Sequence, residues 1–288
     1  MLSEQETIRL DDNDIQLIKD GIKKKYSDKG IVNPIIKDNV FKILESESYV
    51  FYYPIEDEVC AFYMKMYNDS NEEYKIVFIN TNIPYDKQIF AVAHELAHIW
   101  GVAEDKQEIL KNSTTDDYAG FLSASGSKEK HELIANRFAA EFLVREDMLK
   151  NELDKIISKD EEITLIHILK LMDTFLVPYK TIVKRLHEVG RLTEKYLFFL
   201  NLEARDPDSE IVRMQKKMSI CKKNNEVTKE KKMVQFISDA VNLYENNLRT
   251  YSKLKSLLKI FDINSPKEVG LFDKKEELSF ENDHDKNE

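Results

Sequence analysis

The feature that most constrains the fold is the run from His94 to His98, which reads His-Glu-Leu-Ala-His. Residues four apart in an α-helix lie one above the other on the same face, so both imidazoles can point at one spot. That arrangement suits a zinc ion, which binds histidine nitrogens at about 2.0–2.1 Å. Glu95 projects about a quarter of a turn away. There it can accept a proton from a water on the metal, but it cannot bind the metal itself.

The sequence around this run predicts that it is helical. Apolar residues surround the two histidines, neither Gly nor Pro interrupts them, and Gly101 stands where a helix commonly ends. Asp86 can serve as an N-cap or as a first-turn acid. The alternative is a pair of histidines on a helix surface with no metal between them. Two histidines are also too few, because a catalytic zinc site needs three protein ligands and one open position.

A second helix, expected at residues 131–148, can supply the third ligand. Its apolar residues form a broad stripe, as a helix packed against the metal-binding helix requires. Glu132 and Asn136 lie four residues apart and share a face. Glu132 beside the histidines would complete a His₂Glu zinc site, and Asn136 could hydrogen-bond a ligand and orient it. On spacing alone, an ordinary surface position for Glu132 is equally consistent, and Glu129 and Glu141 are weaker candidates.

Three segments before the metal-binding helix predict β-strands: Tyr49–Tyr53, Val59–Met66 and Lys75–Asn80. They are rich in β-branched and aromatic residues, and turn-prone residues separate them. Their order predicts an antiparallel three-stranded meander that leads into the helix. An edge strand beside a metal can hold an extended peptide through main-chain hydrogen bonds, although the sequence does not show which strand lies at the edge. An amphipathic helix is expected before the sheet, at residues 12–26.

Together these segments resemble the ImmA/IrrE family of zinc metallopeptidases. The family pattern is H-E-x-x-H followed by E-x-x-A-N-x-F-A-x-x-L-L, and similar runs stand here at residues 94–98 and 132–143. The resemblance implies that His94, His98 and Glu132 hold zinc and that Glu95 is the catalytic base. It covers roughly the first two hundred residues, since the segment from 165 to 192 resembles the helical pair that follows in that family.

The chain departs from the family pattern in two places. The usual L-L-x-P ending reads Phe-Leu-Val-Arg at residues 142–145, which loses a proline but no ligand. His131, beside Glu132, is not part of the pattern, and it either stabilises an oxyanion or sits exposed. Tyr85 and Tyr118 are further candidates for this second donor, and the sequence does not rank the three.

The rest of the chain predicts further helical units. The predicted domains are a zinc metallopeptidase domain at 1–150, a helical pair at 151–204, a helical, partly coiled-coil-like extension at 205–274 and an acidic disordered tail at 275–288. Residues 101–130 lack periodicity and are either a mobile flap over the site or a plain surface insertion. The helical pair has the spacing of a DNA-binding helix-turn-helix, although packing is the commoner use of such a pair. Apolar residues from 234 to 261 predict either a short homodimeric coiled coil or a segment that folds back on its own chain.

Composition restricts the class of protein. A net charge of −10 argues against general affinity for nucleic acid, although the basic segment 213–232 leaves a local contact open. Cys60 and Cys221 are too few for a disulfide framework and favour a reducing compartment. The N-terminus resembles no secretion signal, and no apolar run is long enough to span a membrane. We therefore expect a cytoplasmic protein.

The sequence thus predicts an α+β protein: a mostly helical, zincin-like domain with a small antiparallel three-stranded sheet, followed by a helical C-terminal region. Through the resemblance, we expect a zinc-dependent endopeptidase with one specific protein substrate. The substrate would be a regulator such as a helix-turn-helix repressor encoded nearby. The alternative is a non-catalytic zinc-fold regulator that acts by binding a protein partner or DNA.

Overall fold

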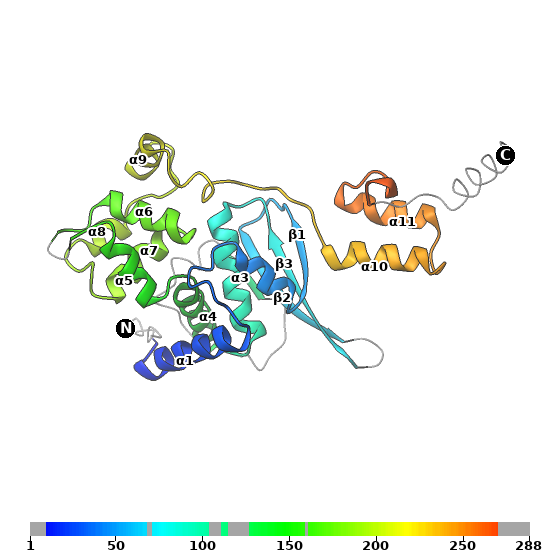
Figure 1. Cartoon of the computed structure of the whole chain (residues 1–288), viewed down its shortest axis with the longest axis horizontal. Coiled ribbons are helices and arrows are strands. Elements are labelled where there is room, and N and C mark those ends of the chain that lie inside the picture. Colours follow the sequence, from blue (N-terminus) through cyan, green and yellow to red (C-terminus); the bar gives the residue numbers. More distant parts are fainter. Residues whose placement is uncertain (1–9, 68–70, 104–110, 115–126, 159–160, 270–288) are drawn as a thin grey trace, which may run out of the picture.

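The computed structural model describes residues 10–67, 71–103, 111–114, 127–158 and 161–269 (Figure 1). In chain order its elements are α1 (Asp12–Asp28), α2 (Asn39–Glu45), β1 (Tyr49–Tyr53), β2 (Val59–Tyr67), β3 (Glu73–Asn80), α3 (Tyr85–Ile99), β4 (Lys111–Thr114), α4 (Ser127–Leu143), α5 (Glu146–Asp154), α6 (Leu165–Phe175), α7 (Tyr179–Glu188), α8 (Tyr196–Leu200), α9 (Glu210–Met218), α10 (Val234–Glu245), α11 (Tyr251–Leu258), η3 (Lys259–Phe261) and η4 (Pro266–Val269). Helices predominate and the described strands form one small sheet, so the predicted α+β class is confirmed. None of the described helices combines the length and the apolar character that crossing a bilayer requires.

The sheet is mixed, so the antiparallel meander expected from the sequence is wrong. The strand order is β1-β3-β2-β4, and β1 pairs with β3 in parallel while β2 pairs with β3 antiparallel. Asn80, at the end of β3, explains why β1 and β2 do not form a hairpin. Its side chain donates to the carbonyls of Asp57 (3.3 Å) and Val59 (2.9 Å) and accepts from the N–H of Ile55 (3.2 Å). The loop after β1 is therefore held at the end of β3, and β2 enters on the far side of that strand.

The helix expected at residues 131–148 is two helices, α4 and α5. The break follows from Arg185 on α7, which is only 1 % exposed. Its Nε donates to the carbonyl of Val144 at 3.0 Å, and its Nη1 lies 2.7 Å from the carboxylate of Glu141. The guanidinium thus binds a carbonyl at the point where α4 ends, and this buried charged network joins α4 to α7.

Helix α3, which carries His94, Glu95 and His98, lies at the centre of the molecule. It packs against β2 and β3 on one side and against α4 on the other, and α1 packs against α4 in turn (Figure 1). Nearly all of its residues are buried, polar ones included. Its buried apolar residues belong to one cluster that runs from Ile18 in α1 to Cys221 after α9. The elements that surround α3 therefore restrict how far its side chains can move.

Residues 234–261 fold back on their own chain, which is one of the two alternatives that the sequence left open. α10 and α11 pack against each other around a small cluster of buried side chains: Ala240, Tyr244, Leu254 and Leu258. The helix breaks after Glu245, and Asn247 has a left-handed backbone (φ 60°). The homodimer and the domain boundaries stay predictions, and the acidic tail at 275–288 lies outside the described residues.

Candidate metal centre

The last two turns of α3 carry the residues that the sequence singled out. His94 and Glu95 are each 2 % exposed, and His98 follows one turn later. Pro84 occupies the N-cap position, so Asp86 is a first-turn acid rather than the cap.

The three predicted ligands converge. The Nε2 atoms of His94 and His98 lie 3.2 Å apart, and the Glu132 carboxylate oxygens lie 3.0 Å from the first and 3.6 Å from the second. All three ligand atoms lie within 4.8 Å of one another, and no other set of this kind occurs among the described residues. Tetrahedral ligands at about 2.0–2.1 Å from zinc stand about 3.3 Å apart, so the side chains fit a zinc ion.

Each imidazole is oriented by a second hydrogen bond. Nδ1 of His94 lies 3.0 Å from Oδ1 of Asn136, and Nδ1 of His98 lies 3.0 Å from the carbonyl oxygen of Ala103. Both partners accept, so each ring donates from Nδ1 and turns the lone pair of Nε2 toward the shared point. Asn136 thus makes the contact to a ligand that its spacing from Glu132 predicted.

Gly101 explains how the carbonyl of Ala103 reaches His98. It has a φ of +69°, a conformation that glycine adopts at little cost. The N–H of Gly101 donates to the carbonyl of His98 (3.1 Å), and the N–H of Val102 donates to that of Ala97 (3.0 Å). This Schellman turn reverses the chain directly after α3. The sequence signalled the turn, but a main-chain carbonyl has no residue signature, so its contact with His98 was missed.

The charges of the site favour a cation at the point of convergence. Burial alone lowers the pKa of His94, but the hydrogen bond with Glu132 and the charges of Glu132 and Glu95, with help from Asn136, raise it to about 9. Two nitrogen lone pairs and a carboxylate that face one another repel unless positive charge lies between them. A divalent metal ion supplies that charge, which is a second reason why these residues fit zinc.

The other predicted site residues differ in where they lie. Tyr85 begins α3, about 13 Å along the axis from His94, and its ring packs near Phe41, which argues against contact with the reacting atoms. His131 adjoins Glu132, and its Nδ1 is buried with no hydrogen-bond partner in the described part of the chain, so a simply exposed His131 is not what the structure has. Tyr118 and most of the predicted flap at 101–130 lie outside the described residues.

Of the two weaker candidates for the third ligand, the structure describes the side chain of Glu141 only. Glu141 lies about 13 Å further along α4 than Glu132 and is paired with Arg137 and Arg185. It therefore belongs to the network between α4 and α7. The side chain of Glu129 lies outside the described part of the chain.

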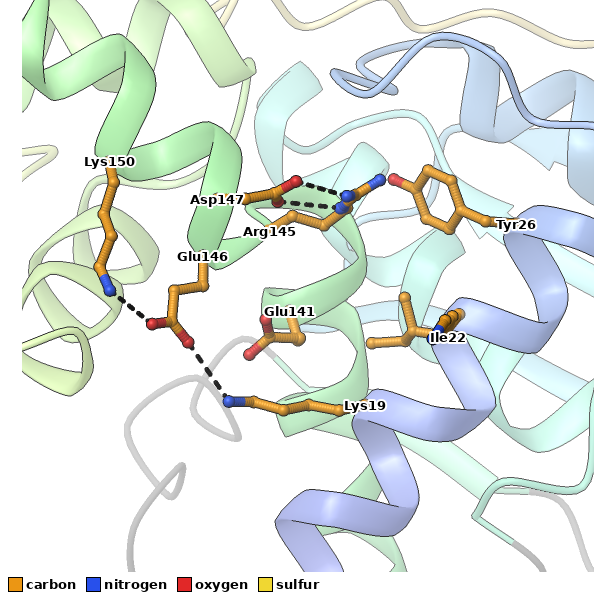
Figure 2. A pocket seen from close by; sticks show the side chains of 9 residues that line it. Lys19, Ile22, Tyr26, Glu141, Arg145, Glu146, Asp147 and Lys150 are labelled. Atoms are coloured by element: carbon orange, nitrogen blue, oxygen red, sulfur yellow. Dashed lines mark hydrogen bonds and ion pairs between the residues drawn. The ribbon is translucent and has the colours of Figure 1, made fainter.

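A separate cavity of about 570 Å³ lies between α1, the end of α4 and α5 (Figure 2). Its apolar wall includes Ile22, and several of its charged side chains pair with one another. Glu146 lies between Lys19 (3.3 Å) and Lys150 (2.6 Å), and Figure 2 shows both contacts. None of the three predicted metal ligands lines this cavity, so it is distinct from the metal centre.

The convergence of two histidines and a carboxylate is typical of a metallopeptidase, and a comparison of the sequence with known protein families gives the same class. Residues 49–187 match the model of the IrrE N-terminal-like domain of the M78 peptidases. This stretch of the chain is therefore an IrrE N-terminal-like domain, and the resemblance to the ImmA/IrrE family drawn from its motifs is confirmed there. The match runs from β1 to the end of α7. No curated protein matches the chain.

Proposed function

We propose that the protein is a zinc-dependent endopeptidase that cleaves one specific regulatory protein. The observation that supports this most is the convergence of His94, His98 and Glu132 within a domain of a peptidase family. Zinc at such a site polarises a peptide carbonyl and lowers the pKa of a water molecule toward about 7.

The chain's own residues would perform the proton transfers. The carboxylate of Glu95 accepts the proton of the attacking water and delivers it to the leaving amine. The burial of Glu95 keeps bulk water from competing for that proton. His131 is the remaining described candidate for a donor to the developing oxyanion, because its buried Nδ1 lacks a hydrogen-bond partner among the described residues.

The substrate class comes from the family resemblance. Members of the ImmA/IrrE family typically cleave a specific regulator, often a helix-turn-helix repressor, which favours one partner protein over general digestion. We propose a protein encoded next to this one as the substrate, and regulation of transcription as the consequence of its cleavage.

The test is incubation of the zinc-loaded chain with the protein encoded by the adjacent gene. Glu95→Gln should keep zinc and abolish cleavage, because only the proton acceptor is lost. His94→Ala should lose the metal itself. Glu203→Gln, an exposed acid away from the site, is the matched control and should behave like the parent. Equal zinc content and equal cleavage in the parent and all three variants would contradict the proposal.

The alternative, a non-catalytic regulator, has weaker support where DNA is the partner. Three lysines of the basic segment pair with acids of this chain: Lys223 with Asp38, Lys231 with Asp262 and Lys232 with Glu45. Most of α7, the second helix of the helical pair, is buried and offers little surface to a DNA groove. Salt-sensitive DNA binding that survives Glu95→Gln, with no cleavage by the parent, would favour the alternative.

A further inference from the structure

The first turn of α3 is capped by a segment far downstream in the chain. Pro84 precedes the helix and makes no side-chain hydrogen bond to it. Instead the N–H of Tyr85 donates to the carbonyl of Glu226 at 2.8 Å, and the N–H of Asp86 donates to the carbonyl of Asn224 at 3.2 Å. A helix cannot satisfy its first amides by itself. Remote carbonyls therefore hold the N-terminal end of α3.

A buried ion pair strengthens this cap. Asp86 is 0 % exposed, and its Oδ1 lies 2.5 Å from Nη2 of Arg205. The other terminal nitrogen of Arg205 donates to the side chain of Asn225. Burial raises the pKa of Asp86, while the charge and hydrogen bond of Arg205 lower it. A buried carboxylate is strongly destabilised when it loses its partner, so the pair ties Arg205 to the start of α3.

Residues 223–232, which we call the strap, continue from this cap along β1 (Figure 1). The N–H of Lys229 donates to the carbonyl of Thr81 at 3.0 Å. Tyr52 and Lys232 exchange two main-chain hydrogen bonds of 2.8 and 3.0 Å. The strap is thus bonded to the sheet and to α3 at once, and it fixes one relative to the other.

The position of α3 along its own axis matters for the metal centre. Most of the other contacts of α3 are apolar packing, which does not depend on direction. The hydrogen bonds and the ion pair of its first turn are directional and therefore fix its position more closely. α4 packs against α3, and Asn136 on α4 bonds His94, but α1 and Arg185 hold α4 as well, so Glu132 would not fully follow a shift of α3. Zinc sites tolerate about 0.2 Å of change in ligand distance. A small shift of α3 would therefore separate its histidines from Glu132.

We propose that Arg205 is a positioning residue for the metal centre: together with the strap it holds α3 where His94 and His98 meet Glu132. Arg205 and the strap both follow residues 49–187, so the unit that forms the metal centre is longer than the family domain. The inference rests on the proposed function only in taking these three side chains as the metal ligands.

The test measures metal binding and needs no substrate. Zinc affinity is determined by competition with a chromogenic chelator, and the ligand geometry is followed by the visible absorption of bound Co²⁺. Arg205→Met should weaken zinc binding by about 10-fold, the lower end of the effect of losing a group that bonds a ligand directly, and should alter the Co²⁺ spectrum. Arg205→Lys should recover part of the affinity, because it restores the positive charge beside Asp86.

Arg191→Met is the matched control. It removes an arginine whose Nη1 lies 3.1 Å from Asp154, far along the chain from α3, and should leave affinity and spectrum unchanged. A folded Arg205→Met with parental affinity and spectrum would overturn the inference, whatever its stability. If that variant does not fold, the double variant Asp86→Asn/Arg205→Met removes both charges and is judged by the same two outcomes. A parent that binds zinc but cleaves nothing would contradict the proposed function and leave this inference intact.

Discussion

The body of the molecule and the α10–α11 hairpin are both helical, but their stability has different sources. In the body, apolar side chains from α1 to Cys221 after α9 form one continuous cluster around α3. In the hairpin, four buried side chains form a cluster of their own. A helical pair this small buries too little apolar surface to be stable alone. The candidate metal centre therefore lies in the extensively packed region, and the hairpin depends on its connection to the body.

The largest effect is expected from a cavity in the body. Phe138 is fully buried on α4, where its ring contacts Trp100 and Phe142. Phe138→Ala should lower the free energy of unfolding by about 3–5 kcal/mol. Trp100 is the single tryptophan of the chain, so its fluorescence during denaturant unfolding reports on the body. A loss below about 1 kcal/mol would mean that this core is packed less tightly than the structure indicates.

A cavity in the hairpin should have a smaller and local effect. Leu254→Ala should cost the hairpin about 2–3 kcal/mol and melt α10 and α11, because Leu254 is one of its four buried residues. Circular dichroism should then show fewer helical residues while the midpoint of Trp100 fluorescence stays at the parental value. An equal shift of both signals would contradict the comparison, since body and hairpin would then unfold as one unit.

The smallest effect is expected where the strap begins. Lys223 lies 2.6 Å from the carboxylate of Asp38 on the surface, so Lys223→Ala should cost less than about 1 kcal/mol at neutral pH. The hydrogen bond from Lys223 lowers the pKa of Asp38, although burial partly opposes it. The pair thus stabilises the folded state above pH about 4 and loses this effect as the pH falls and Asp38 is protonated. Unfolding of parent and variant from pH 7 to pH 2 should show the difference disappear; a difference that persists at pH 2 would assign it to something other than this charge.

The parts of the fold that follow from local patterns were predicted from the sequence. Strands at 49–53, 59–66 and 75–80 correspond closely to β1, β2 and β3. The spacing of His94 and His98, the stop at Gly101 and the shared face of Glu132 and Asn136 all depend on residues within one or two helical turns. Hydrophobic periodicity and capping residues predict such short-range relations directly from the sequence.

The features of the fold that were not predicted from the sequence depend on contacts between segments far apart in the chain. β1 pairs with β3 because Asn80 holds a loop some 25 residues earlier, and α4 stops where Arg185 binds the carbonyl of Val144, directly after the helix. The cap of α3 is made by main-chain carbonyls at Asn224 and Glu226, whose side chains give no sign of it. No local pattern contains these partners, so a single sequence does not reveal them.

The remote cap also has a consequence for the order in which the protein can be completed during translation. α3 leaves the ribosome well before residues 224–226, and until these are synthesised the amides of Tyr85 and Asp86 cannot make their native hydrogen bonds. A nascent chain that already contains all three predicted metal ligands therefore still lacks the contacts that complete the helix. Ribosome stalling or premature termination before residue 224 would release a polypeptide in which the first turn of α3 lacks these partners.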